Sequence, residues 1–164
     1  MITIKRLLIA VLVIGCFLGN LWLGRPALAM TDQEARTVKL NDKETITLTP
    51  REISKGKALF KNACATCHLG GATFTNPNVG LDPESLSLAN PPRNTIAGLV
   101  DYMKNPTTFD GVEEIYEVHP STRSSDIFPT MRGLTDNDLK LIAGYILYQP
   151  NVKGAGWGGG KIYY

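Results

Sequence analysis

The feature that most constrains this chain is the pentapeptide Cys64-Ala65-Thr66-Cys67-His68. Two cysteines separated by two residues and followed by a histidine form the attachment signature of c-type haem. This spacing lets two thioether bonds reach the two vinyl groups of one porphyrin, and the next residue supplies the proximal nitrogen to the iron. We therefore predict that Cys64 and Cys67 bind one covalent haem c and that His68 is an axial ligand of its iron.

Two other kinds of site use closely spaced cysteines. A zinc site needs a second pair of ligands, and the sequence contains neither a second C-x-x-C pattern nor two histidines at zinc-site spacing. A redox-active cysteine pair is expected near a βαβ pattern, which this chain lacks. Both alternatives therefore explain the motif less well than haem attachment does.

The first thirty residues have the pattern of an export signal. Lys5 and Arg6 precede an apolar stretch that runs to Leu23, and the small-x-small triplet Ala27-Leu28-Ala29 follows. This combination is typical of a secretory signal peptide. We expect residues 1–29 to be removed and residues 30–164 to form one monohaem cytochrome c domain. Export of this domain agrees with the haem motif, because c-type haem is attached outside the cytoplasm.

Two alternatives for the same segment are a permanent membrane anchor and a lipoprotein cleavage site at Cys16. The apolar stretch is barely long enough to span a bilayer, and polar residues interrupt it. The residues after Cys16 remain strongly apolar, whereas a mature lipoprotein usually becomes polar there. Signal cleavage after Ala29 remains the prediction.

Cleavage changes the charge and the cysteine count. The whole chain has 17 basic and 15 acidic side chains, for a formal charge of +2, which is too small to argue for nucleic-acid binding. Without Lys5, Arg6 and Arg25 there are 14 basic and 15 acidic side chains, a formal charge of −1. Cys16 is also removed, so the mature domain keeps only the two cysteines of the haem motif.

Local patterns predict a mainly α-helical domain with a short N-terminal β-hairpin. Apolar residues alternate with polar ones over residues 36–48, on both sides of a polar turn. Next, Thr49-Pro50-Arg51-Glu52 forms a capping box with proline at the first helical position. The helix that it begins leads to Cys64, with Gly56 and Phe60 on one face.

Two further helices are predicted from apolar residues at helical spacing. One covers residues 94–105, and the last begins at Thr135 and ends before Pro150. We expect the last helix to cross the Gly56 and Phe60 face of the first one, with Gly144 permitting the close approach. Residues 69–93 and 106–134 are expected to be largely loop around the haem.

The second axial ligand of the iron has several candidates. Met30 and Met103 are expected to be ordinary residues, since one begins the mature chain and the other belongs to an apolar helix face. Met131 precedes the last helix, where class I cytochromes c carry their methionine ligand. His119 is the second histidine of the chain, and Pro120 favours an extended backbone there. The residues alone leave Met131 and His119 as equal candidates.

Several segments resemble the PsbV family, the extrinsic low-potential cytochromes c of cyanobacterial photosystem II. The resemblance rests on residues 90–93, 99–111, 118–121, 126–129 and 157–164. It implies a class I cytochrome c-like fold and a bis-histidine iron, with His119 of the His-Pro motif as the distal ligand. It also implies that Met131 is a neighbour on the distal side. We expect Tyr145 to be a haem-pocket or helix-packing aromatic rather than a ligand.

The resemblance also implies a function. Such a protein binds the photosystem II core beside PsbO and PsbU, peripherally on the lumenal side of the thylakoid membrane. It stabilises the oxygen-evolving manganese–calcium centre and helps to retain calcium and chloride. The alternatives are a diffusible monohaem electron carrier and a haem enzyme, and the enzyme is least favoured because two protein ligands leave the iron no open position.

Two surface segments are open to two interpretations each. Residues 154–164 combine five glycines with Trp157 and two terminal tyrosines, which suits either a frayed end or an anchor that docks on a partner. Docking is what the resemblance implies. The acidic cluster Glu113, Glu114 and Glu117 is expected to be a solvated face rather than a contact with basic loops of a partner.

Overall fold

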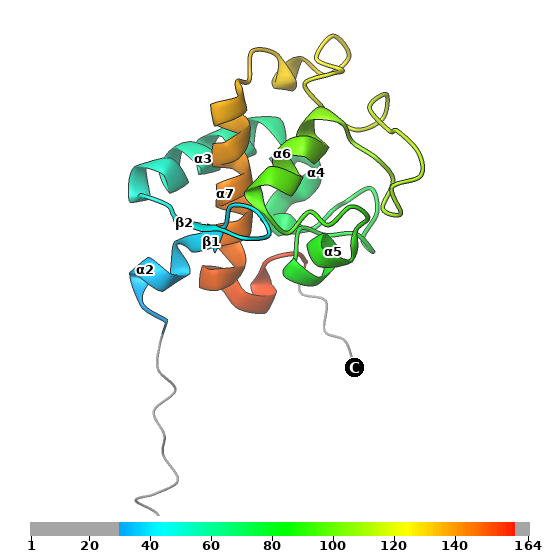
Figure 1. The fold of residues 1–164 in the computed structure, drawn as a ribbon. Helices are drawn as coiled ribbons and strands as arrows, with labels where there is room; N and C mark the ends of the chain where they lie inside the picture. Colours follow the sequence, from blue (N-terminus) through cyan, green and yellow to red (C-terminus); the bar gives the residue numbers. More distant parts are fainter. Residues whose placement is uncertain (1–29, 160–164) are drawn as a thin grey trace, which may run out of the picture. The chain divides into compact units, whose positions relative to one another are not determined.

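The predicted helices and hairpin are present in the computed structural model, which describes residues 30–159 (Figure 1). The predicted signal peptide, residues 1–29, and the last five residues of the chain lie outside the described residues. The helices and strands are, in chain order, α2 Asp32–Ala35, β1 Thr37–Lys39, β2 Thr45–Thr47, α3 Pro50–Ala63, α4 Ala65–His68, α5 Pro83–Leu88, α6 Ile96–Lys104 and α7 Asp136–Lys153. Short 3-10 turns lie at Leu69–Gly71, Pro129–Met131 and Gly154–Gly156.

The hairpin forms as the alternation predicts. Strands β1 and β2 are antiparallel, and Val38 lies opposite Ile46. Val38 and Leu48 are buried in the core, whereas Ile46 is 38% exposed. Strand β1 therefore contacts the core through Val38, whereas all three residues of β2 are exposed.

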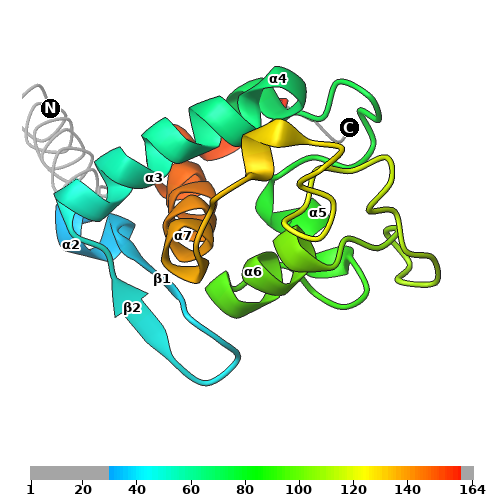
Figure 2. The same ribbon diagram turned by 90° about the horizontal axis from the view of Figure 1, so that it is seen from above.

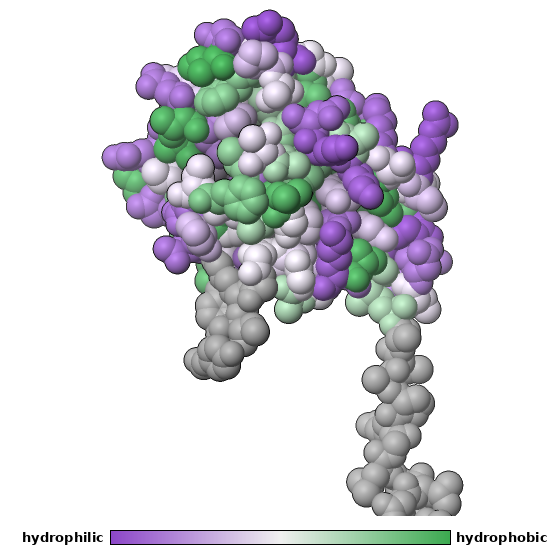
Figure 3. All heavy atoms as spheres, turned by 180° about the vertical axis from the view of Figure 1, so that it is seen from behind, coloured by the Kyte–Doolittle hydropathy of each residue, from purple (hydrophilic) through white to green (hydrophobic). Residues whose placement is uncertain are grey.

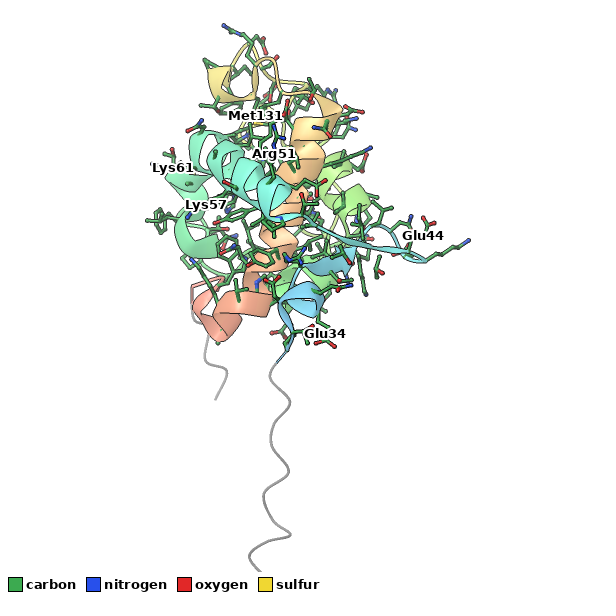
Figure 4. The ribbon with its side chains drawn as sticks, turned by 90° about the vertical axis from the view of Figure 1, so that its left-hand side faces the viewer. Glu34, Glu44, Arg51, Lys57, Lys61 and Met131 are labelled. Atoms are coloured by element: carbon green, nitrogen blue, oxygen red, sulfur yellow. The ribbon has the colours of Figure 1, made fainter. Side chains whose placement is uncertain are left out.

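Helix α3 begins with the predicted capping box. The Thr49 hydroxyl accepts a hydrogen bond from the Glu52 backbone N–H, and the Glu52 carboxylate accepts one from the Thr49 N–H at 2.7 Å. The outer face of α3 is exposed and basic, and Figure 4 shows Arg51, Lys57 and Lys61 on this helix. Because its polar face points to solvent, the helix turns Gly56 and Phe60 inward.

Helices α3 and α7 pack closely, and Figure 2 shows α7 between α3 and α6. The close approach occurs at Gly56, where a Cβ atom in place of the glycine hydrogen would clash with the backbone oxygen of Leu141. The prediction that Gly144 permits this approach is wrong. Gly144 instead faces the Leu48 side chain at the end of the hairpin, because α7 turns a different side to α3.

The prediction that the last helix ends before Pro150 is also wrong. Helix α7 continues through Pro150 to Lys153. A proline inside a helix removes one backbone hydrogen bond, but tertiary contacts can hold the following turn. One such contact is the hydrogen bond of 2.9 Å from the Asn151 side-chain amide to the Ala35 carbonyl oxygen.

The segments expected to be largely loop contain short elements that the patterns did not predict. Asp82 caps α5 by accepting a hydrogen bond from the Ser85 N–H at 2.9 Å, and Pro83 is its first residue. Outside those segments, Thr31 and Glu34 form a capping box at α2, a helix that the patterns also did not predict. Both caps could have been found from the sequence, since serine, threonine or aspartate followed by proline or glutamate is a helix-start signal.

Within residues 30–159, no helix is long and apolar enough to cross a membrane. On the face seen in Figure 3, hydrophobic side chains form small separate groups between hydrophilic ones. Scattered apolar side chains of this kind are ordinary on a protein surface. Glu113, Glu114 and Glu117 are exposed, as expected of a solvated face, and Glu114 pairs with Arg123 at 2.9 Å.

Candidate haem site

The cysteine motif forms one helical turn directly after α3. Cys64 departs from helical geometry with φ of −122°, although its N–H still donates to the Phe60 carbonyl oxygen at 2.9 Å. The turn α4 then closes with hydrogen bonds from the Cys67 and His68 N–H groups to the Cys64 carbonyl oxygen. Neither cysteine is part of a disulfide, so both sulfur atoms are available for thioether bonds. One rigid turn thus presents the two sulfurs and the imidazole together, as covalent attachment to one porphyrin requires.

The imidazole of His68 is held by the segment that follows it. Its Nδ1 atom lies 3.0 Å from the Thr73 hydroxyl oxygen. The Phe74 N–H donates to the Cys67 carbonyl oxygen at 2.9 Å and folds this segment back over the motif. With Nδ1 hydrogen-bonded, Nε2 is the nitrogen left to bind a metal.

His119 comes from the long loop between α6 and α7. The Ile115 N–H donates to the Pro106 oxygen at 2.9 Å, and the His119 N–H donates to the Ile115 oxygen at 2.8 Å. After the histidine, the Thr122 N–H donates to the Met103 oxygen of α6 at 3.1 Å. These bonds fix the backbone of the His-Pro motif on both sides, so the imidazole has a defined position.

The side chain of His119 is oriented by its own neighbour. Its Nδ1 atom lies 3.0 Å from the Pro120 carbonyl oxygen, which can only accept a hydrogen bond. Nδ1 therefore carries the proton in this arrangement, and Nε2 keeps its lone pair. Both histidines of the described chain are thus prepared for ligation through Nε2.

The two imidazole rings lie close to one another. Their ring centres lie 6.2 Å apart, with an angle of 52° between the ring planes. Two metal–imidazole bonds of about 2 Å, arranged in line, separate the ring centres by roughly 6 Å. The gap between His68 and His119 therefore fits one metal ion bound to both.

Burial keeps both imidazoles neutral. Desolvation lowers the pKa of His119 from 6.5 to about 4, and the neighbouring His68 contributes to the shift. Desolvation also lowers the pKa of His68, while hydrogen bonding to the Ala72 backbone opposes the change. Burial raises the pKa of the Cys64 thiol to about 12. The site thus holds uncharged groups, as expected of an apolar cofactor pocket.

The methionine candidates occupy the hydrophobic core. Met131 is 3% exposed, belongs to the core cluster and lies beside α3 (Figure 4). Met103 is buried on α6, as its helical spacing predicts, and Met30 is 56% exposed. The structure therefore brings His119, rather than a methionine, opposite the His68 imidazole.

Two further residues beside His119 were not predicted as site residues. The Tyr102 ring contacts the His119 ring edge-on, with 5.0 Å between the ring centres. The guanidinium carbon of Arg93 lies 3.8 Å from the centre of the Tyr102 ring. Neither has a motif of its own. The signal that could have found Arg93 is a single arginine between Pro92 and an apolar helix.

Trp157 is neither part of a frayed end nor an exposed docking anchor, because its side chain is 3% exposed. Its indole N–H donates to the Leu81 carbonyl oxygen at 2.8 Å. Its ring packs against Phe60 and Tyr145, with ring centres 5.8 and 6.1 Å away. Trp157 is therefore a core residue, and Tyr145 is a packing aromatic as the sequence predicts.

Comparison with known proteins identifies the family of this chain. The family model of the cytochrome c-550 domain matches residues 29–164. The chain belongs to the cytochrome c-550 family. The crystal structure of cytochrome c549 is 55% identical, with a TM-score of 0.76, over 78% of this chain and 100% of that one. The predicted class I cytochrome c-like fold is thereby confirmed.

Two curated relatives share the name Photosystem II extrinsic protein V with each other. Photosystem II extrinsic protein V of Trichormus variabilis is 63% identical over 134 residues, which are 81% of this chain and 82% of the relative. The protein of that name from Cyanophora paradoxa is 56% identical over 153 residues, 93% of this chain and 94% of the relative. These relatives span most of the chain.

Membership of the cytochrome c-550 family means that the chain carries a covalently attached haem c. The residues present fit this group, since two cysteines that form no disulfide lie on one helical turn and two imidazoles lie 6.2 Å apart. The zinc alternative finds no support, because residues 30–159 contain no cluster of three or more histidine, cysteine or acidic side chains. The predicted haem c is confirmed.

Proposed function

We propose that this chain is an extrinsic haem c subunit of photosystem II, with the haem attached to Cys64 and Cys67 and its iron held by His68 and His119. The observation that carries the assembly is the identity of 63% to Photosystem II extrinsic protein V of Trichormus variabilis. The observation that carries the ligation is the 6.2 Å separation of the two imidazole rings. The buried, uncharged surroundings of the two histidines are consistent with this ligation.

The residues of the chain attach the haem and orient the proposed ligands of its iron. Cys64 and Cys67 attach it to the end of α3, so that it cannot dissociate. The Pro120 carbonyl oxygen orients His119 by accepting a hydrogen bond from its Nδ1–H, and the Thr73 hydroxyl is hydrogen-bonded with Nδ1 of His68. Such outer partners fix the ring orientation and raise the basicity of the ligand. Haem iron with these ligands supplies one-electron redox chemistry at a low potential.

A bis-histidine iron has no open position for a substrate, so the proposed role is not catalytic. The subunit would act by binding. It would lie on the lumenal side of the thylakoid membrane beside PsbO and PsbU, stabilise the oxygen-evolving manganese–calcium centre and help to retain calcium and chloride. The alternative of a diffusible electron carrier shares the haem but requires no lasting association with the photosystem.

Reconstitution distinguishes the two functions. Photosystem II depleted of its extrinsic haem subunit would be assayed for oxygen evolution at limiting calcium and chloride, with and without the purified holoprotein. We expect the protein to restore oxygen evolution and to sediment with the membranes. Absence of restoration, together with fast reduction of the haem by a donor complex, would instead establish the electron carrier.

A further inference from the structure

Arg93 is a buried cation that has no counter-ion among residues 30–159. It is 8% exposed, and all three of its hydrogen bonds leave from Nη2. The acceptors are the carbonyl oxygens of Thr107 and Thr108, at 3.1 and 2.8 Å, and the Thr107 hydroxyl oxygen at 3.3 Å. Within the described residues, its Nε is the one buried side-chain nitrogen or oxygen without a hydrogen-bond partner.

This arrangement is costly unless an anion completes it. A buried charge is stable in a protein when it is paired, and neutral acceptors offset only part of the desolvation. The ion pairs among residues 30–159 involve Arg36, Lys55, Lys104 and Arg123, and none of them includes Arg93. A guanidinium with an unused N–H is suited to binding a carboxylate.

The position of Arg93 indicates where that carboxylate comes from. Its guanidinium stacks on Tyr102, and the same Tyr102 ring contacts the edge of His119. The uncompensated charge is thus one aromatic ring away from the proposed distal ligand. Haem c is itself a dicarboxylate, because each porphyrin carries two propionate groups. The haem that lies beside His119 therefore brings its own carboxylates to this part of the protein.

We propose that Arg93 binds a haem propionate and that Tyr102 holds its guanidinium in place for this contact. Arg93 is a positioning residue, and the proposal rests on the haem lying between His68 and His119. A cation at this place also stabilises the reduced haem, which carries one more negative charge than the oxidised haem. Arg93 therefore raises the reduction potential that the bis-histidine iron would otherwise have.

The test compares substitutions of two arginines in the holoprotein. Arg123 is the matched control, since its guanidinium also stacks on a tyrosine, Tyr116 at 4.0 Å, but is paired with Glu114 at the surface. Resonance Raman spectroscopy reports the propionate-bending frequency, and a redox titration gives the midpoint potential. We expect Arg93→Gln to shift the bending band and lower the potential, Arg93→Lys to have a smaller effect, and Arg123→Gln to have none.

A propionate band and a potential equal to the wild type in Arg93→Gln would overturn the proposal. If that variant does not retain its haem, an NMR measurement on the wild-type holoprotein tests the contact instead. With ¹⁵N-labelled arginine, the Nε–H signal of Arg93 should lie downfield of the surface arginines, whereas a signal at the free-arginine position would contradict the contact. Failure of the bis-histidine ligation would appear separately, as a changed spin state or ligand band in the wild type.

Discussion

The imidazole rings of His68 and His119 lie 6.2 Å apart although they come from the motif after α3 and from the loop between α6 and α7. Each ring has its Nδ1 hydrogen-bonded, to Thr73 and Pro120 respectively. Burial lowers the pKa of both imidazoles, so both stay neutral. The two proposed iron ligands are therefore oriented by the protein itself, which reduces the cost of ordering them when the haem is bound.

Replacing Thr73 by valine should change the haem potential without changing the ligands. The substitution removes the hydroxyl 3.0 Å from His68 Nδ1 and keeps the side-chain shape. A weaker hydrogen bond makes the imidazole less electron-donating, so the oxidised iron loses stability and the midpoint potential rises. We expect a rise of up to about 60 mV, which is a tenfold change for a one-electron couple. Thr66, exposed in the same motif, provides the control: Thr66→Val should leave the potential unchanged, and equal potentials in all three proteins would contradict this role.

Two glycine-to-alanine substitutions should show which glycine permits the close approach of α3 and α7. At Gly56 a new methyl group would clash with the Leu141 backbone oxygen, so α3 and α7 must move apart. Overpacking of this kind costs about 1–3 kcal/mol or more of unfolding free energy. At Gly144 the nearest atom belongs to the flexible Leu48 side chain at 3.1 Å, and better helix propensity offsets the crowding.

Urea denaturation of the holoprotein measures this difference. We expect Gly56→Ala to be strongly destabilised and Gly144→Ala to stay within about 1 kcal/mol of the wild type. The reverse order would show that α3 and α7 approach at Gly144 after all.

Trp157 should contribute a large part of the stability of the domain. Truncation to alanine removes an indole that is 3% exposed and packed on Phe60 and Tyr145, a change that typically costs about 3–5 kcal/mol. Trp157→Phe keeps a ring but loses the hydrogen bond to Leu81, at a cost of about 1–2 kcal/mol. Denaturant titrations would measure both. A loss of less than about 1 kcal/mol for Trp157→Ala would mean that the segment is detached in solution.

Asp138 should make the stability of the domain depend on acid pH. Hydrogen bonds from Thr135 and from Lys55 lower its pKa from 3.8 to about 2. Because the folded-state pKa lies below the unfolded one, the contribution is complete above about pH 4 and is lost as the pH falls through 2. The unfolding free energies of wild type and Asp138→Asn should therefore differ above pH 4 and converge near pH 2. A difference that is independent of pH would exclude this linkage.

Much of the fold follows from local sequence signals, because capping and alternation act over a few residues. The Thr49 capping box, the hairpin and the helix before Pro106 could all be predicted. The end of α7 could not, because the turn after Pro150 is held by Asn151, whose partner Ala35 is far away in the sequence. The role predicted for Gly144 was wrong for a similar reason. A glycine in a helix permits close approach of another segment, but the tertiary packing decides which segment that is.

The candidate site was predictable to different degrees. Cys64, Cys67 and His68 belong to one contiguous motif, so spacing alone indicates their chemistry. His119 was equal to Met131 on the residues alone, and resemblance to a family was needed to choose between them. Arg93 was missed as a site residue because the observation that singles it out is a buried Nε without a hydrogen-bond partner, and burial and hydrogen bonding are not visible in a sequence.

The most direct test of bis-histidine ligation is the near-infrared magnetic circular dichroism spectrum of the oxidised holoprotein. This spectrum separates bis-imidazole iron from imidazole–thioether iron by the position of the ligand-to-iron charge-transfer band. With His68 and His119 as ligands, we predict a bis-imidazole, low-spin spectrum that is lost in His119→Ala. A methionine–iron charge-transfer band in the wild type, or an unchanged spectrum in His119→Ala, would contradict this ligation.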